Sequence, residues 1–327
     1  MGVDSDLAQP PRRHKFESSR GPRRFNPYGQ KRCPRSEHRF SPRNLVPGLI
    51  RIFSDLHYGD RASRLRTLAQ LDPLVSGVSQ LILNGDTFDT RHSTHLHHTN
   101  RIRAEANSYF STCAPEVTLL TGNHDPDISN HHTLDLVGGQ VFVTHGDIIF
   151  EDVVPWGRDA AYFTARIKRD LAALDEKSRG ELGPRLTIAR AACLGLPQGH
   201  QAEPNLFKYA VQLAADSLWP PLRSLRILRA WRETPARAAV IAASHRPAAR
   251  FMLIGHTHRP GVWTTPSGLT VINTGSFSRP FGALAVDLTP THLTVRRIVA
   301  RAQHFELGHV IAEFALAESP TSKKIPI

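Results

Sequence analysis

Short apolar runs recur along the chain, and five of them end in polar residues that can bind a metal. The runs are Leu49–Phe53, Gln80–Leu83, Val117–Leu120, Val141–Val143 and Phe251–Ile254. Their length and their content of branched apolar residues predict buried strands. Each strand would deliver its polar residues to one edge of a sheet, which is where α/β folds usually place a ligand.

The segments between these runs predict helices and further strands. Helical apolar spacing covers Arg64–Leu74, Arg101–Thr112, Arg158–Leu174 and Phe207–Trp231, the last broken by Pro220 and Pro221. Alternating patterns with Gly and Pro turns predict antiparallel strands at Gly261–Thr265, Leu269–Asn273, Ala283–Leu288 and His292–Val299. The alternation of strands and helices predicts a layered α/β domain with its site on one rim.

Composition divides the chain into regions. Its 327 residues, 40% of them hydrophobic, can bury a substantial core. Residues 1–47 are rich in Pro, Arg and Ser and predict a disordered basic tail. We expect one folded domain over residues 48–300, interrupted by an inserted helical cap at 153–250, and a peripheral C-terminal segment at 301–327.

The net charge of +12 is concentrated in two regions. Residues 1–47 carry 11 Lys and Arg against 4 Asp and Glu, and residues 153–250 carry 16 against 8. This distribution favours an anionic substrate or surface that approaches the tail or the insertion. Solvated arginines explain the charge of the tail equally well, and they explain that of the insertion less well because it interrupts the series of ligands. An apolar stripe beside some of these arginines comprises Trp219, Leu222, Leu225, Leu228 and Trp231. Core packing is the simpler interpretation of the stripe, and an amphipathic cap for a lipid-bearing substrate or an anionic bilayer is the alternative.

Three features bear on cellular location. No apolar run is long enough to span a membrane, and residues 1–47 contain no apolar signal segment. Cys33, Cys113 and Cys193 are odd in number and widely spaced, which favours free thiols in a reducing compartment. We therefore expect a cytoplasmic protein, with peripheral contact at the inner face of the membrane as an extension of the cap interpretation.

The polar residues at the strand ends form a candidate metal centre. The candidate ligands are Asp55, His57, Asp86, Asn123, His145, His256 and His258. Oxygen and imidazole ligands without thiolates suit Mn²⁺ first, with Fe or Zn²⁺ as alternatives. Seven ligands exceed the needs of one tetrahedral site, so we predict two divalent ions that share a carboxylate. Such a pair can clamp a phosphate and acidify a water, which leads to hydrolysis.

Five motifs resemble those of the calcineurin-like metallophosphoesterase family. In order they are Asp55-x-His57, Gly85-Asp86-x-x-Asp89, Gly122-Asn123-His124-Asp125, His145-Gly146-Asp147 and Gly255-His256-x-His258. The resemblance implies a four-layer α/β sandwich of two mixed sheets flanked by helices, and it assigns the ligands to two sets. Asp55, His57 and His258 would hold one metal, Asn123, His145 and His256 the other, and Asp86 would bridge them.

The resemblance also assigns the catalytic groups and suggests a substrate. His124 would stabilise the phosphoryl oxygens or protonate the leaving oxygen, and Asp125 would orient it. The segments Ser54–His57 and Gly255–Pro260, with the helical insertion, are similar to UDP-2,3-diacylglucosamine hydrolases, although those typically carry arginine where this chain has His124. A phosphoester or pyrophosphate hydrolase acting on a small or lipid-linked substrate is the leading hypothesis. A nuclease or nucleotide phosphodiesterase that binds nucleic acid through the basic regions is the alternative, and a non-catalytic scaffold ranks last because no ligand is missing.

Overall fold

The computed structural model describes residues 46, 48–93, 95–113, 115–199, 203, 205–218 and 222–317. The predicted disordered tail, residues 1–47, therefore lies outside the described residues apart from Val46. Cys33 also lies outside them, and Cys113 and Cys193 are both free thiols.

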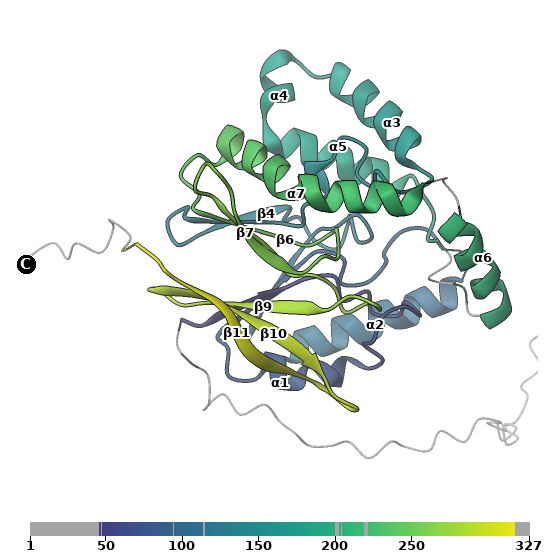
Figure 1. Cartoon of the computed structure of the whole chain (residues 1–327). Coiled ribbons are helices and arrows are strands. Elements are labelled where there is room, and N and C mark those ends of the chain that lie inside the picture. The colour runs from purple at the N-terminus through teal and green to yellow at the C-terminus, as the bar shows by residue number, and fades with distance from the viewer. Residues whose placement is uncertain are drawn as a thin grey trace, which may run out of the picture. The chain divides into compact units, whose positions relative to one another are not determined.

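Two mixed sheets form the centre of the fold (Figure 1). The first has the order β11 (Phe305–Ala315), β10 (His292–Ala300), β9 (Ala283–Leu288), β1 (Ile50–Phe53), β2 (Gln80–Asn84) and β3 (Glu116–Leu120). The second has the order β4 (Thr133–Leu136), β5 (Val141–Thr144), β6 (Phe251–Ile254), β8 (Thr270–Asn273) and β7 (Gly261–Thr264). β1, β2 and β3 run parallel, as do β5, β6 and β8. Within each parallel group the carboxyl ends therefore meet at one edge, as the sequence predicts.

Alternate residues of the strands enter different layers of the core. In β1, Ile52 packs in the cluster that joins the two sheets, whereas Phe53 packs toward the helices that follow β1 and β2. In β5, Val143 joins the cluster between the sheets and Phe142 faces the helices of the insertion. Because side chains alternate across a strand, both sheets are covered on both faces. The predicted four-layer α/β sandwich is confirmed.

The helices fall into two groups. A 3-10 helix at Leu68–Leu71, α1 (Asp72–Val75) and α2 (Leu96–Thr112) cover the first sheet. The segment between β5 and β6 contains α3 (Ala160–Ala172), α4 (Glu176–Gly180), α5 (Leu182–Leu194), α6 (Leu206–Leu218) and α7 (Arg223–His245). Side chains of α5 and α7 pack on the second sheet, so this segment supplies the fourth layer of the sandwich as well as a cap. None of the described helices is long and apolar enough to cross a membrane.

Three expectations about elements need correction. The helix predicted over Arg64–Leu74 is two short turns, because Pro73 stands at the start of α1 rather than near the end of a longer helix. The domain continues beyond residue 300, since β11 pairs along β10 and buries Phe305. The core interpretation of the apolar stripe is wrong for three of its members, since Leu222, Leu225 and Leu228 are 69%, 59% and 50% exposed. Trp231, in contrast, is partly buried. Trp219 lies outside the described residues.

Candidate metal centre

All seven candidate ligands lie in loops that follow strand ends. Asp55 and His57 follow β1, Asp86 follows β2, Asn123 follows β3, His145 follows β5, and His256 and His258 follow β6. Six of the side chains are buried, and His258 is partly exposed. The site therefore draws on three strands of the first sheet and two strands of the second.

The backbone at these ligands adopts a conformation that costs energy. Left-handed φ values between 46° and 64° occur at Asp55, His57, Asp86, His256 and His258. Non-glycine residues rarely adopt such values, and they persist where the surrounding structure fixes them, often at functional sites. The loop after β3 passes close to Asp86, and only a glycine fits at Gly122, because a Cβ at this position would overlap Asp86. Five of the seven candidate ligands are thus aimed by strained backbone.

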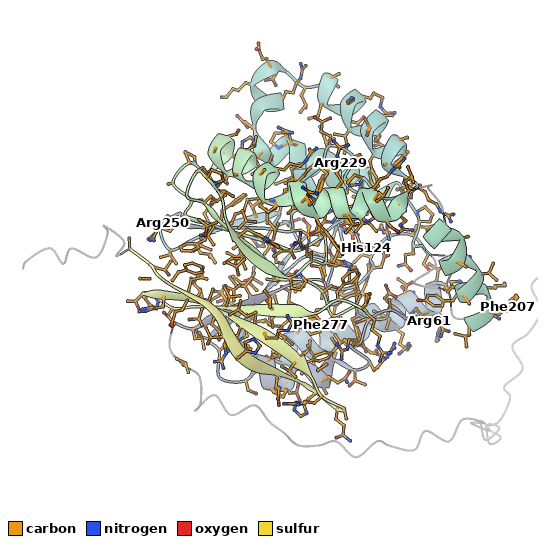
Figure 2. The ribbon with its side chains drawn as sticks, in the orientation of Figure 1. Arg61, His124, Phe207, Arg229, Arg250 and Phe277 are labelled. Atoms are coloured by element: carbon orange, nitrogen blue, oxygen red, sulfur yellow. The ribbon has the colours of Figure 1, made fainter. Side chains whose placement is uncertain are left out.

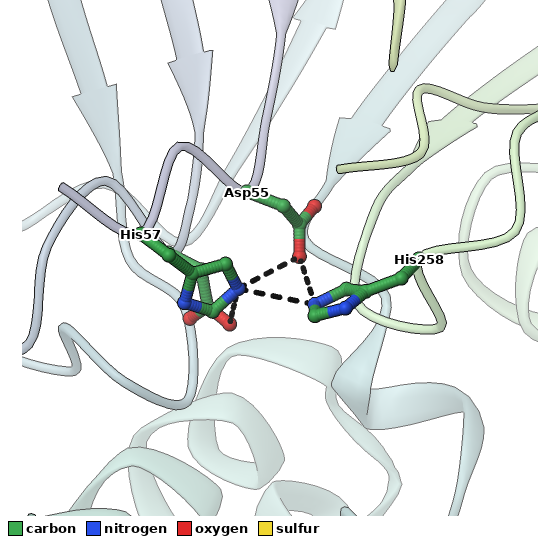
Figure 3. Close-up of side chains that lie close together, drawn as sticks. Asp55, His57 and His258 are labelled. Carbon is green, nitrogen blue, oxygen red and sulfur yellow. Dashed lines mark hydrogen bonds and ion pairs between the residues drawn. The ribbon is translucent and has the colours of Figure 1, made fainter. Parts of the chain in front are cut away.

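The first ligand set is compact (Figure 3). One ligand atom from each of Asp55, His57, Asp86 and His258 lies within 4.8 Å of the others. The Nε2 atoms of His57 and His258 are 3.0 Å apart, and His258 Nε2 is 3.1 Å from Asp55 Oδ1. The oxygens and lone pairs of these groups converge on one point, which is the arrangement that a divalent cation requires.

The second set shows the same convergence around Asn123 Oδ1. His145 donates from Nδ1 to the carbonyl of Asn84 at 2.9 Å, and His256 donates from Nε2 to the carbonyl of Val153 at 2.7 Å. Their other ring nitrogens face Asn123 Oδ1, at 3.2 Å from His145 and 2.8 Å from His256. His145 Nε2 is also 3.4 Å from Asp86 Oδ2, so Asp86 joins both sets. Backbone carbonyls that fix the ring orientation are typical of histidines that bind metals.

The electrostatics fit two cations. Burial disfavours the charged forms of Asp55 and Asp86, but the surrounding histidines hold the pKa of each carboxylate below its usual range. Burial likewise lowers the pKa of His57 and His145, yet the nearby carboxylates outweigh it and raise the pKa values to about 9 and about 10. In the metal-free site, protons on the histidines balance the negative charge of the carboxylates. Bound cations would neutralise that charge in their place.

His124 lies beside these sets and is held by Asp89. Its Nδ1 is 3.1 Å from Asp89 Oδ2, and its backbone N–H donates to Asp86 Oδ1 at 2.9 Å. Arg91 donates to both oxygens of Asp89, at 3.0 and 2.6 Å, and its Nη2 is 2.9 Å from His124 Nδ1. Sequence reasoning missed Arg91, although a cation two residues after a motif carboxylate is a usable signal.

Asp125 has a different position from the one expected. Its oxygens accept the backbone N–H groups of Gly122, Asp86 and Thr87 at 2.7 to 2.9 Å. Asp125 therefore holds together the loops after β2 and β3, whereas the carboxylate that contacts the His124 ring is that of Asp89. Burial and the charge of Asp86 raise the pKa of Asp125 to about 7.

A pocket of about 350 Å³ opens over the ligands. Asp86, Asn123, His124, His256 and His258 contribute to its floor, and Arg91, Arg158 and Arg223 add positive charge. Its apolar lining comprises Val154, Trp156, Phe163, Leu196, Pro197, Ile227, Trp231 and Phe281. Trp231 is fixed by donating from its indole N–H to the carbonyl of Thr257 at 2.8 Å. The insertion therefore supplies most of the apolar lining, together with Arg158 and Arg223, beside four of the candidate metal ligands.

Comparison with known proteins gives one family match, over part of the chain. Residues 49–177 match the model of the calcineurin-like phosphoesterase family, which confirms the resemblance drawn from the motifs. No curated protein shows significant similarity to the chain.

Similar solved structures include Vps29 from Chaetomium thermophilum, with 12% identity and a TM-score of 0.41 over 84% of this chain and 99% of that one. Vacuolar protein sorting 29 from Cryptosporidium parvum has 11% identity and a TM-score of 0.40, covering 82% and 98%. A dimetal phosphatase from Danio rerio has 14% identity and a TM-score of 0.38, covering 76% and 95%.

Proposed function

Since residues 49–177 match the model of the calcineurin-like phosphoesterase family, we propose that this protein hydrolyses phosphoester or pyrophosphate bonds with two divalent metal ions. One observation carries the proposal: two sets of oxygen and imidazole ligands converge on separate points and share Asp86. His256 and His258 lie outside the matched segment, and the fold nevertheless brings both into these sets.

Each of the two ligand sets would bind one metal ion. Asp55, His57, Asp86 and His258 would hold one ion, and Asp86, Asn123, His145 and His256 the other. When bound, such a pair supplies positive charge for the phosphate oxygens and lowers the pKa of a water molecule. The absence of thiolates favours Mn²⁺, with Fe and Zn²⁺ as alternatives.

The residues around the ligands would complete the reaction. With Nδ1 of His124 on Asp89, the ring can present Nε2 to the substrate and protonate the leaving oxygen. Arg91 lines the same pocket, where its guanidinium can neutralise charge on the phosphate. Asp125 keeps the backbone of the Asp86 loop and the Asn123 loop in register through the three N–H groups that it accepts.

The pocket supports a substrate that joins a phosphate to an apolar group. Its arginines suit phosphate or pyrophosphate, and its wall of Trp156, Phe163, Ile227 and Trp231 suits hydrocarbon. We therefore extend the proposal to a lipid-linked pyrophosphate that resembles UDP-diacylglucosamine. The similarity of the Ser54–His57 and Gly255–Pro260 segments to the corresponding hydrolases favours the same class.

The test compares substrates on metal-free protein reconstituted with Mn²⁺. A UDP-linked diacylated sugar, its deacylated form, a simple aryl phosphodiester and a single-stranded oligonucleotide are assayed together, with Asp86→Asn as the inactive control. We expect kcat/KM for the diacylated sugar to exceed that of the deacylated form by about tenfold or more, the effect of roughly 1.4 kcal/mol of apolar contact.

Each other outcome has a defined meaning. Hydrolysis of the aryl ester alone would retain the phosphoesterase and remove the lipid-linked substrate. Preference for the oligonucleotide would favour a nuclease. If the protein bound two Mn²⁺ ions and cleaved none of the four compounds, the proposed activity would be wrong.

A further inference from the structure

We infer that Arg190, a buried arginine on α5, is a positioning residue for the second ligand set, so that the insertion helps to build the metal centre beneath it. This inference rests on the proposed two-metal function. It assigns a role to a residue that belongs to none of the five motifs.

Arg190 is almost fully enclosed. Its exposed fraction is 3%, and that of its partner Asp147 is 0%. The guanidinium forms a two-pronged ion pair with the carboxylate of Asp147, with Nη2 at 3.0 Å from Oδ1 and Nη1 on Oδ2. The other side of the guanidinium binds Thr121, where Nε donates to Oγ1 at 2.8 Å and Nη2 donates to the carbonyl at 3.0 Å. The fixed fork of five donors in an arginine permits this double contact, and a lysine could not reproduce it.

The two partners belong to two ligand loops. Thr121 is two residues before Asn123, in the loop after β3, and Asp147 is two residues after His145, in the loop after β5. These strands lie in different sheets. One side chain from the insertion therefore ties together the loops that carry two ligands of the second set.

The contact is selective for that set. Asp55 and His57 follow β1, and His258 follows β6, so the loops that Arg190 holds carry no ligand that is unique to the first set. The distance from Asn123 Oδ1 to His145 Nε2 is 3.2 Å. A small displacement of either loop would change this separation, and with it the geometry offered to the second ion, while the first set stayed in place.

A role in stability alone is the competing explanation, because breaking a buried ion pair destabilises a protein wherever it lies. The chain provides a matched control in Arg51, whose guanidinium forms a two-pronged pair with Asp287 at 2.6 and 2.9 Å. Arg51 is also buried, at 5% exposed, and it joins β1 to β9 and binds the carbonyl of Leu74. It resembles Arg190 in burial and pairing but contacts neither loop of the second set.

The experiment measures Mn²⁺ binding to the full-length wild type, Arg190→Met and Arg51→Met. Calorimetry and metal analysis give stoichiometry and affinity, and electron paramagnetic resonance distinguishes coupled Mn²⁺ pairs from single ions. We expect Arg190→Met to keep the first ion within about threefold of the wild-type affinity and to weaken the second by about tenfold or more, a change of roughly 1.4 kcal/mol. The spectrum of the pair should then give way to that of a single ion, whereas Arg51→Met should keep the pair.

Several outcomes would overturn the inference. Two ions bound by Arg190→Met with wild-type affinities would do so, as would equal metal loss in Arg190→Met and Arg51→Met. If Arg190→Met does not fold, Thr121→Val removes the hydroxyl that accepts from Arg190 Nε and that also contacts His132 Nδ1 at 2.7 Å. This variant should weaken the second ion in the same direction, and unchanged binding by folded Thr121→Val would overturn the inference. Wild-type protein that binds fewer than two ions would instead refute the proposed two-metal function, and the inference with it.

Discussion

Asp89, rather than Asp125, holds the imidazole of His124, and this contact makes a prediction at the scale of single residues. His124→Ala should lower kcat by roughly 10²- to 10⁴-fold, the usual contribution of a general acid. Asp89→Asn should lower it less, because the amide oxygen can still accept from the ring, although the charge and one of the two contacts to Arg91 are lost. Both variants should still bind two Mn²⁺ ions, whereas Asp86→Asn should lose metal as well as activity. Full activity in His124→Ala would show that the leaving oxygen is protonated by another group.

Metal binding should depend on pH because of His57 and His145. Their pKa values of about 9 and about 10 mean that both rings are protonated at pH 7 in the metal-free protein. A cation must displace these protons, so affinity should rise as the pH increases from 6 toward 9. His256 adds no proton, since burial and the charge of His145 lower its pKa to about 4. Calorimetry in two buffers of different ionisation enthalpy measures the protons released, and identical heats in both buffers would contradict the prediction.

At the scale of elements, α7 shows how a pattern of large apolar residues can mislead. The face that packs on the second sheet carries Ala230, Thr234, Ala238 and Ala242, all buried, while Leu225 and Leu228 are exposed. Small side chains let the helix approach the sheet closely. A prediction that takes the large apolar residues to be buried therefore selects the exposed face of α7. On α6, Phe207 points away from the protein in the same manner and is 77% exposed (Figure 2).

This reversal of faces predicts opposite mutational effects along one helix. Leu225→Ser combined with Leu228→Ser should change the free energy of unfolding by no more than about 0.5 kcal/mol per site, as exposed positions usually do. Ala238→Leu should lower it by roughly 1 to 3 kcal/mol, because the added methylenes have no room. Urea unfolding measures both changes. A larger loss in the double serine variant than in Ala238→Leu would mean that the stripe is core after all.

The elements that the sequence predicts well are those that local pattern determines. The runs ending at Phe53, Leu83 and Ile254 are strands because short branched apolar segments suit a buried sheet. Patterns fail where the deciding partner is distant in the chain. Nothing near Arg190 indicates that it will meet Thr121, and the carbonyl of Val153 that orients His256 carries no sequence signal at all.

The candidate ligands follow the same division. Motif order selects all seven, since each follows a strand whose pattern is clear. Their assignment to two sets came from family resemblance, and the contact that orients His124 had to come from the fold. Asp89 and Asp125 both stand close to motif ligands, and only the folded chain shows which carboxylate reaches the ring.

At the scale of the molecule, each ligand set crosses from one sheet to the other. The first joins Asp55, after β1, to His258, after β6, and the second joins Asn123, after β3, to His145, after β5. A bound ion would therefore link the two halves of the sandwich, and ligands that bind only the folded state stabilise it by mass action.

Removal of the metals should consequently destabilise the whole domain. One ion present at 100 times its Kd adds about 2.7 kcal/mol to the free energy of unfolding. At roughly 2 to 4 °C per kcal/mol for a large domain, chelation of two ions should lower Tm by about 10 °C or more. Thermal unfolding with Mn²⁺ and with excess chelator measures this shift, and Asp86→Asn, which loses the shared ligand, should show little of it. An equal Tm in both conditions would mean that the ions do not bind the folded chain in preference to the unfolded chain, and it would contradict the proposed metal centre.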